Sequence, residues 1–162
     1  VNAHVFQMGQ SVEGLRGMGT TLCCICLHRE GLIYAHVGDS RIYRLRRGHL
    51  SQLTCDHVVW VENGGESRRK GVLTKAIGSD HRVDPVVHCG SLCKEDLLLL
   101  CSDGLSDLLS FEKIEQILCN MPHENAVAAL IAAAKERGGY DNITVALIHI
   151  LEKHESKNLS RP

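Results

Sequence analysis

The sequence lacks a charge excess of either sign, any long apolar run and any recognisable leader segment. The formal net charge of the 162 residues is −1, whereas nucleic-acid-binding domains usually carry a basic excess. No apolar stretch reaches the roughly 18 residues expected of a membrane span. The first residues do not show the charged head and apolar run of a secretory signal. We therefore expect a cytoplasmic protein with no nucleic-acid or membrane partner.

Cysteine and histidine, in contrast, are abundant, with eight and ten residues. Inside an apolar run a cysteine behaves as a small buried hydrophobe, and four cysteines lie in such runs: Cys23, Cys24, Cys26 and Cys101. We expect reduced thiols rather than a disulfide framework. A zinc-binding protein is an alternative, for which His88, Cys89 and Cys93 are the nearest approach to a ligand cluster.

The pattern of apolar residues predicts more strands than helices. Short apolar or alternating runs separated by turn residues predict strands at 20–28, 32–37, 41–45, 50–53, 83–91, 96–101 and 143–151. Helical spacing predicts helices at 1–12, 111–119 and 122–137. The polar segment 55–70 is expected to form a short helical turn and a mobile loop. Because turns join most strands, we predict an α+β fold of antiparallel sheets with helices outside.

Three carboxylates occur where a buried run meets a small or polar residue: Asp39, Asp103 and Asp141. Taken singly, each is accounted for as a turn or cap residue. If their strands are neighbours, however, three acidic groups converge at one edge, where mutual repulsion would raise their pKa values. A divalent cation would relieve that repulsion, and all-oxygen ligation favours Mg²⁺ or Mn²⁺ over Zn²⁺. Such an ion makes a nucleophile from water at neutral pH.

Six stretches around these residues resemble the bacterial branch of the PPM-type (type 2C) metal-dependent serine/threonine protein phosphatases. They occur in the order and at the approximate spacing of that family. They are GMGTTL (17–22), AHVGDSRIY (35–43), LTCDH (53–57), LTKAIG (73–78), LLCSDGLSD (99–107) and GYDNITV (139–145).

The resemblance implies a four-layer α-β-β-α sandwich of two antiparallel sheets flanked by helices. It implies hydrolysis of phosphoserine and phosphothreonine in proteins of a serine/threonine kinase signalling pathway, by a metal-activated water with two or three Mn²⁺ or Mg²⁺ ions. By position, Asp103 and Asp141 would be the catalytic pair that ligates the first metal, and Asp39 with Asp103 would hold an additional one. Asp107 would serve its helix. The implied supporting residues are Gly38, Ser40, Arg41, Gly104 and Asn142.

The sequence departs from the family pattern in two places. The N-terminal motifs that supply a phosphate-binding Arg and a metal-bridging Asp are absent, so residues 1–151 are expected to be a partial catalytic domain, followed by a polar tail at 152–162. Such a fragment is expected to be weakly active or inactive, and to self-associate through exposed sheet edges. The segment 57–72 is a shortened version of the family's flap, either contacting substrate or forming a solvated loop. A non-catalytic protein-interaction module of the same fold is the alternative function.

Overall fold

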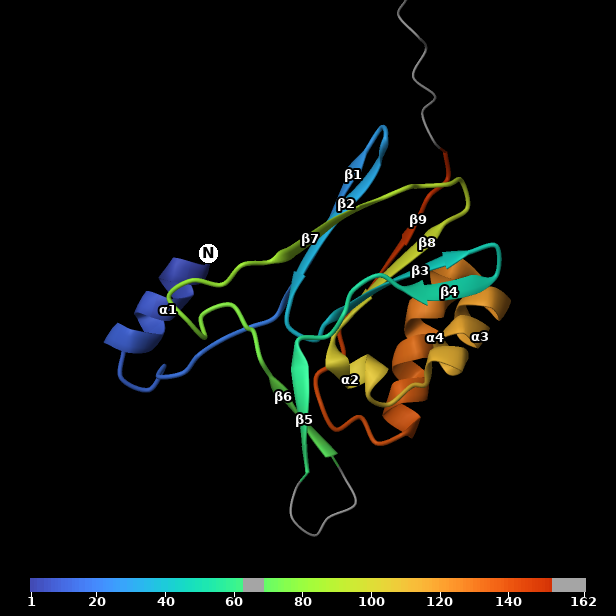
Figure 1. The fold of residues 1–162 in the computed structure, drawn as a ribbon. Helices are drawn as coiled ribbons and strands as arrows, with labels where there is room; N and C mark the ends of the chain where they lie inside the picture. The colour runs from blue at the N-terminus through green and yellow to red at the C-terminus, as the bar shows by residue number, and fades with distance from the viewer. Residues whose placement is uncertain (63–68, 153–162) are drawn as a thin grey trace, which may run out of the picture.

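A computed structural model describes residues 1–62 and 69–152 of the chain. Figure 1 shows two sheets and a projecting hairpin, with helices to the sides. The strands are β1 (Leu22–His28), β2 (Gly31–Val37), β3 (Arg41–Arg46), β4 (His49–Gln52), β5 (Val58–Glu62), β6 (Arg69–Leu73), β7 (Val86–Gly90), β8 (Leu97–Cys101) and β9 (Val145–His149). The helices are α1 (Asn2–Ser11), α2 (Asp103–Ser106), α3 (Phe111–Asn120) and α4 (His123–Glu136).

Both main sheets are antiparallel. One has the strand order β1-β2-β7 and the other β4-β3-β8-β9, while β5 and β6 form a separate hairpin. In the second sheet, β8 pairs on one side with β3, placing Cys101 opposite Arg41, and on the other side with β9, placing Cys101 opposite Val145. The predicted α+β class with two antiparallel sheets flanked by helices is confirmed.

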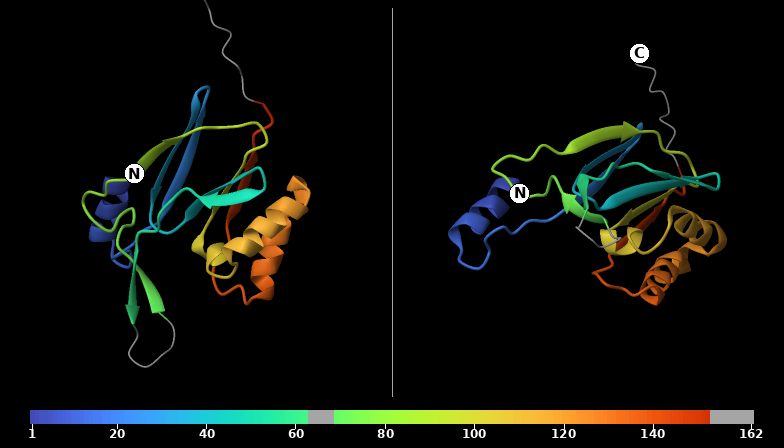
Figure 2. Two further views of the ribbon diagram at one scale, coloured as in Figure 1. Left: turned by 45° about the vertical axis from the view of Figure 1, so that its right-hand side comes forward. Right: turned by 60° about the horizontal axis from the view of Figure 1, so that its bottom comes forward.

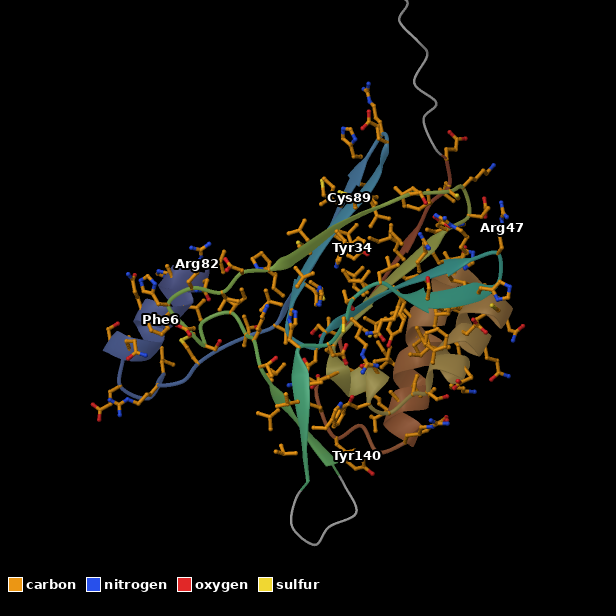
Figure 3. The ribbon with its side chains drawn as sticks, viewed as in Figure 1. Phe6, Tyr34, Arg47, Arg82, Cys89 and Tyr140 are labelled. Atoms are coloured by element: carbon orange, nitrogen blue, oxygen red, sulfur yellow. The ribbon has the colours of Figure 1, made fainter. Side chains whose placement is uncertain are left out.

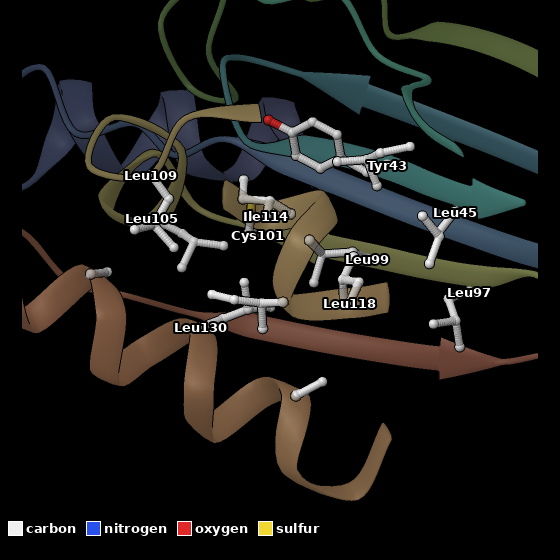
Figure 4. Close-up of a cluster of buried hydrophobic side chains, with 14 residues drawn as sticks. Tyr43, Leu45, Leu97, Leu99, Cys101, Leu105, Leu109, Ile114, Leu118 and Leu130 are labelled. Carbon is white, nitrogen blue, oxygen red and sulfur yellow. The ribbon is translucent and has the colours of Figure 1, made fainter. Parts of the chain in front are cut away.

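Strand β8 lies at the centre of the apolar core. Its side chains alternate between the two faces of the sheet, as the pleat requires. Leu98 packs with Leu32 of β2 between the two sheets, whereas Leu97 and Leu99 face the helices on the other side. Figure 4 shows the cluster that contains Leu97 and Leu99, in which Leu130 of α4 also packs. Because both faces of β8 are covered, its sequence is a continuous apolar run.

Helices α3 and α4 cover the outer face of the β4-β3-β8-β9 sheet (Figure 2). The side chain of Ser110 caps α3 by accepting a hydrogen bond from the Lys113 N–H. Ala126, Leu130 and Ala134, spaced four residues apart, form the buried stripe of α4. Among the described residues, no helix is long and apolar enough to cross a membrane.

Helix α1 lies to one side of the sandwich (Figures 1 and 2). The Asn2 side-chain amide donates hydrogen bonds to the carbonyl oxygens of Asp80 and His81, and Phe6 packs edge-on against the His81 ring. Figure 3 shows Phe6 in the region of Arg82, well away from the helices α3 and α4. On the β1-β2-β7 sheet, Ile33 remains 44% exposed.

Two expectations from the sequence are wrong. The segment 55–70 does not begin with a helical turn, because residues 58–62 form β5 and pair with β6. Cys24 and Cys26 are exposed rather than buried, since they lie on the open outer face of β1; Cys101 is buried as expected. All eight cysteines are free. The predicted loop residues 63–68 and the tail residues 153–162 lie outside the described parts of the chain.

Candidate metal-binding site

Two of the three carboxylates singled out by the sequence, Asp39 and Asp103, line one cavity. Asp39 follows β2 and Asp103 begins α2 immediately after β8, so the cavity lies at neighbouring strand ends, where the backbone is held by the sheets. Its volume is about 270 Å³. The lining residues are Asp39, Arg41, Asp56, Val58, Trp60, Gly71, Asp103 and Asp107.

The backbone before Asp39 turns at a position that only glycine fits well. Gly38 has a φ of +103°, a conformation that side chains disfavour, and a Cβ there would collide with Thr21. The Thr21 and Ser40 hydroxyls are hydrogen-bonded at 2.7 Å. The turn that carries Asp39 is therefore packed tightly against the segment leading into β1.

A second close approach fixes the chain next to Asp103. A Cβ on Gly104 would overlap with the carbonyl oxygen of Asn142 and would lie 3.5 Å from the carbonyl carbon of Asp141. The Ser102 hydroxyl donates to that Asn142 oxygen at 3.0 Å, and accepts from the Thr144 N–H at 3.0 Å. These contacts hold the loop before β9 beside the start of α2.

Asp141 itself lies at the edge of this arrangement rather than in the cavity lining. Its side chain is exposed and accepts a hydrogen bond from the Asn142 N–H at 2.7 Å. Tyr140, the residue before it, is 78% exposed, and Figure 3 shows it at the same end of the molecule as the β5–β6 hairpin. The structure thus brings Asp39 and Asp103 to one cavity and the backbone of Asp141 to its border.

The acidic groups in the cavity disfavour one another's ionised forms. Burial raises the pKa of Asp39 above its usual value, and the nearby Asp103 raises it further. Asp107 has a raised pKa for the same two reasons, with a smaller effect of Asp141. A divalent cation among these carboxylates would remove this repulsion.

Arg41 is a supporting residue whose charge is already matched. Its guanidinium donates to both carboxylate oxygens of Asp56, at 2.6 to 3.0 Å, and to the Tyr43 hydroxyl at 3.1 Å. Gln52 also donates to Asp56, at 3.0 Å. This two-pronged pair ties β3 to the chain entering the hairpin. Among the described residues, Asp39, Asp103 and Asp107 are the lining carboxylates that form no ion pair.

The donor set fits a hard divalent ion in kind, because the available ligands are all carboxylate oxygens. In residues 1–62 and 69–152, however, no three His, Cys, Asp or Glu side chains converge closely enough to form a metal site. This includes the zinc alternative at His88, Cys89 and Cys93. Asp107, expected to serve its helix, also lines the cavity. Its spacing of four residues from Asp103 is the signal that could have identified it, because such residues share a helix face.

A cysteine nucleophile is not supported by the structure. Cys23 and Arg29 have the Cys-x5-Arg spacing of cysteine-dependent phosphatases, but Cys23 lies within the extended strand β1. Burial raises the pKa of its thiol to about 12, so the nucleophilic thiolate is scarce at neutral pH. The cavity carboxylates are the better candidates for chemistry.

Comparison with known proteins identifies the family to which these residues belong. The family model described as protein phosphatase 2C matches residues 6–147. The chain is 36% identical to protein phosphatase PhpP of Streptococcus pneumoniae, over 94% of this chain and 66% of that protein. The solved serine/threonine phosphatase of S. agalactiae superposes with a TM-score of 0.81 at 34% identity, covering 92% of this chain and 66% of that one.

A third relative was solved with metal. The catalytic domain of the serine/threonine protein phosphatase PstP, in complex with two manganese ions, superposes with a TM-score of 0.79 at 32% identity. The match covers 93% of this chain and 67% of that chain. The chain described here therefore spans about two thirds of the length of the relatives that it matches.

Proposed function

The chain belongs to the protein phosphatase 2C family, and from this we propose that it serves the metal-dependent hydrolysis of phosphoserine and phosphothreonine in proteins. The observation that carries the proposal is the cavity that Asp39, Asp103 and Asp107 line together, none of them in an ion pair with another described side chain. Relatives of the chain are named serine/threonine phosphatases. A bound Mn²⁺ or Mg²⁺ would supply Lewis-acid activation of water and of the phosphoryl group.

In this proposal the chain's own residues hold and place the cation. Asp103 and Asp141 would hold one ion, and Asp39 with Asp103 would hold another. Gly38 and Gly104 allow the close backbone packing on which these positions depend. Arg41 keeps Asp56 neutralised, so that Asp56 does not compete for the ion. Ser40 and Asn142 anchor the two loops through their contacts with Thr21 and Ser102.

The substrates, location and assembly follow from the same proposal. Phosphoproteins of a serine/threonine kinase pathway are the expected substrates, in the cytoplasm. Strands β1 and β9 each end a sheet in the described part of the chain, and unpaired edges favour association with another chain. We propose that residues 1–151 form the domain concerned and that it self-associates. Sedimentation showing a monodisperse monomer would contradict the self-association.

A non-catalytic binding module is the second candidate. It is favoured by the finding that no three-ligand group forms among the described residues. Such a module would keep the fold but would neither bind Mn²⁺ at Asp103 nor release phosphate.

Mn²⁺ titration of the purified chain separates these functions. We expect Asp103→Asn to weaken Mn²⁺ binding by roughly tenfold or more, because it removes a shared ligand charge. Asp84→Asn is the matched control, since Asp84 is 74% exposed and pairs with Arg82 outside the cavity. Phosphate release from a phosphothreonine peptide, assayed with Mn²⁺ and with the chelated ion, gives the activity. Equal Mn²⁺ affinity in both variants, together with no phosphate release, would favour the non-catalytic module.

A further inference from the structure

The ring of Trp60 is held in place by a glycine opposite it. Trp60 of β5 pairs with Gly71 of β6, and a Cβ on Gly71 would lie 3.4 to 3.8 Å from three atoms of the indole ring. The ring therefore covers the bare backbone of Gly71, an arrangement in which an aromatic residue compensates for a strand glycine. Even so, Trp60 remains 58% exposed, so much of its apolar surface faces no other part of the described chain.

The part of this hairpin face nearest the acidic cavity, formed by Val58, Trp60, Gly71 and Leu73, is apolar and continuous with that cavity. Side chains two residues apart share a face of a strand, which places Val58 beside Trp60 and Leu73 opposite Val58. Val58, Trp60 and Gly71 line the cavity together with Asp39 and Asp103. Leu73 is 41% exposed. Among the residues of this face whose side chains are described, none is charged.

We propose that Trp60, with Val58 and Leu73, forms a subsite for an apolar side chain next to the phosphorylated residue of a peptide substrate. This inference rests on the proposed phosphatase function, because that function places the phosphate at the adjoining carboxylate cavity. An apolar occupant is favoured because it would cover exposed hydrophobic surface that is otherwise hydrated. A bulky chain would fit against the ring without needing any hydrogen-bond partner.

The chain offers a direct probe, since Trp60 is its single tryptophan. The fluorescence emission of Trp60 is recorded while phosphothreonine peptides are titrated into the full chain in the presence of Mn²⁺. The peptides contain no tryptophan or tyrosine and carry Leu, Ala or Lys beside the phosphothreonine. We expect the Leu peptide to bind roughly fivefold more tightly than the Ala peptide, the gain from partial burial of one leucine. We also expect its binding alone to shift the Trp60 emission to shorter wavelength.

Three variants test the assignment by calorimetric titration and by kcat/KM for phosphate release. Trp60→Ala should abolish the preference for Leu over Ala, whereas Trp60→Phe should retain most of it. Val59→Ala is the matched control, because Val59 is 52% exposed on the opposite face of the same strand, and it should leave the preference intact. Far-UV circular dichroism of each variant confirms the fold.

The outcomes distinguish this subsite from the function on which it rests. Phosphopeptides that bind or are hydrolysed with no dependence on the neighbouring residue overturn the subsite and leave the phosphatase function standing. A preference for Lys that depends on Trp60 also overturns it, since the ring would then recognise a cation. If no phosphopeptide binds or is hydrolysed in the presence of Mn²⁺, the phosphatase function fails and the subsite fails with it.

Discussion

Replacing Gly104 by alanine sets two physical effects against each other. Gly104 lies within α2, where alanine is favoured over glycine by about 1 kcal/mol on helix propensity alone. A Cβ at this position, however, would overlap with the backbone carbonyl of Asn142, which cannot rotate away as a side-chain end could. Forcing extra atoms into such a packed site costs about 1–3 kcal/mol. Because the overlap is with backbone, we expect the steric term to exceed the propensity term and Gly104→Ala to destabilise the fold by up to about 2 kcal/mol.

The same substitution should also affect the metal. To relieve the overlap, the loop of Asp141 and Asn142 must move away from α2, which separates Asp141 from Asp103. Urea unfolding followed by circular dichroism measures the stability, and calorimetric titration measures the Mn²⁺ affinity, which we expect to fall severalfold. Gly48→Ala is the control, because Gly48 has a φ of +79° but nothing within 4 Å of its Cβ position. It should cost stability without changing Mn²⁺ binding. A stabilised Gly104→Ala protein with unchanged affinity would refute the packing argument.

Three further results are expected. Asp96→Ala should destabilise the fold by about 3 kcal/mol in urea unfolding, because Asp96 is buried and paired with Arg46 at 2.6 Å; the exposed Asp84→Ala should cost less than about 1 kcal/mol. Burial acts to raise the pKa of Asp96, but hydrogen bonds from Arg46 and the Cys93 N–H hold it below the usual value. The stability from this depressed pKa is present above about pH 4 and is lost as the pH falls through the folded-state pKa, so Asp96→Asn should flatten the acid limb of a stability–pH curve; an unchanged limb would contradict this. Burial raises the pKa of Cys101 to about 12, so this thiol should react with a disulfide reagent only after unfolding and give a slow phase in the labelling time course. A Cys101→Ala protein should lack that slow phase.

Local sequence patterns predicted the elements whose burial is evident from the spacing of apolar residues within the element itself. The continuous apolar run of β8 and the helical spacing of apolar residues along α4 predicted both elements within a few residues. The hairpin was missed because Val58–Glu62 pairs with Arg69–Leu73 across a polar segment, although that segment contains Asn63-Gly64, a common hairpin-turn signal. A run of Val58, Val59 and Val61 nevertheless has strong β propensity, so a strand could have been predicted from composition.

The burial of residues on an outer sheet face could not be predicted from the sequence, for a different reason. Cys24 and Cys26 lie in an apolar run, yet alternation along a strand predicts only that they share a face, not whether another layer covers it. The prediction of the cavity residues was likewise limited to those that local sequence patterns mark. Asp39 and Asp103 were found because each follows a strand, but Asp56 enters the cavity from the chain leading to the hairpin that was missed.

The carboxylate cavity cannot be explained as a device that stabilises the fold. Asp39 and Asp107 both have raised pKa values, caused by burial and by Asp103, so bringing these groups together costs free energy when they are ionised. The close packing at Gly104 adds a position where only the smallest residue fits. Positions that break local rules without a stabilising return tend to be functional. A bound cation would make this unfavourable term favourable. Because binding and folding are linked, the charge repulsion that destabilises the fold would then contribute to the affinity for the cation.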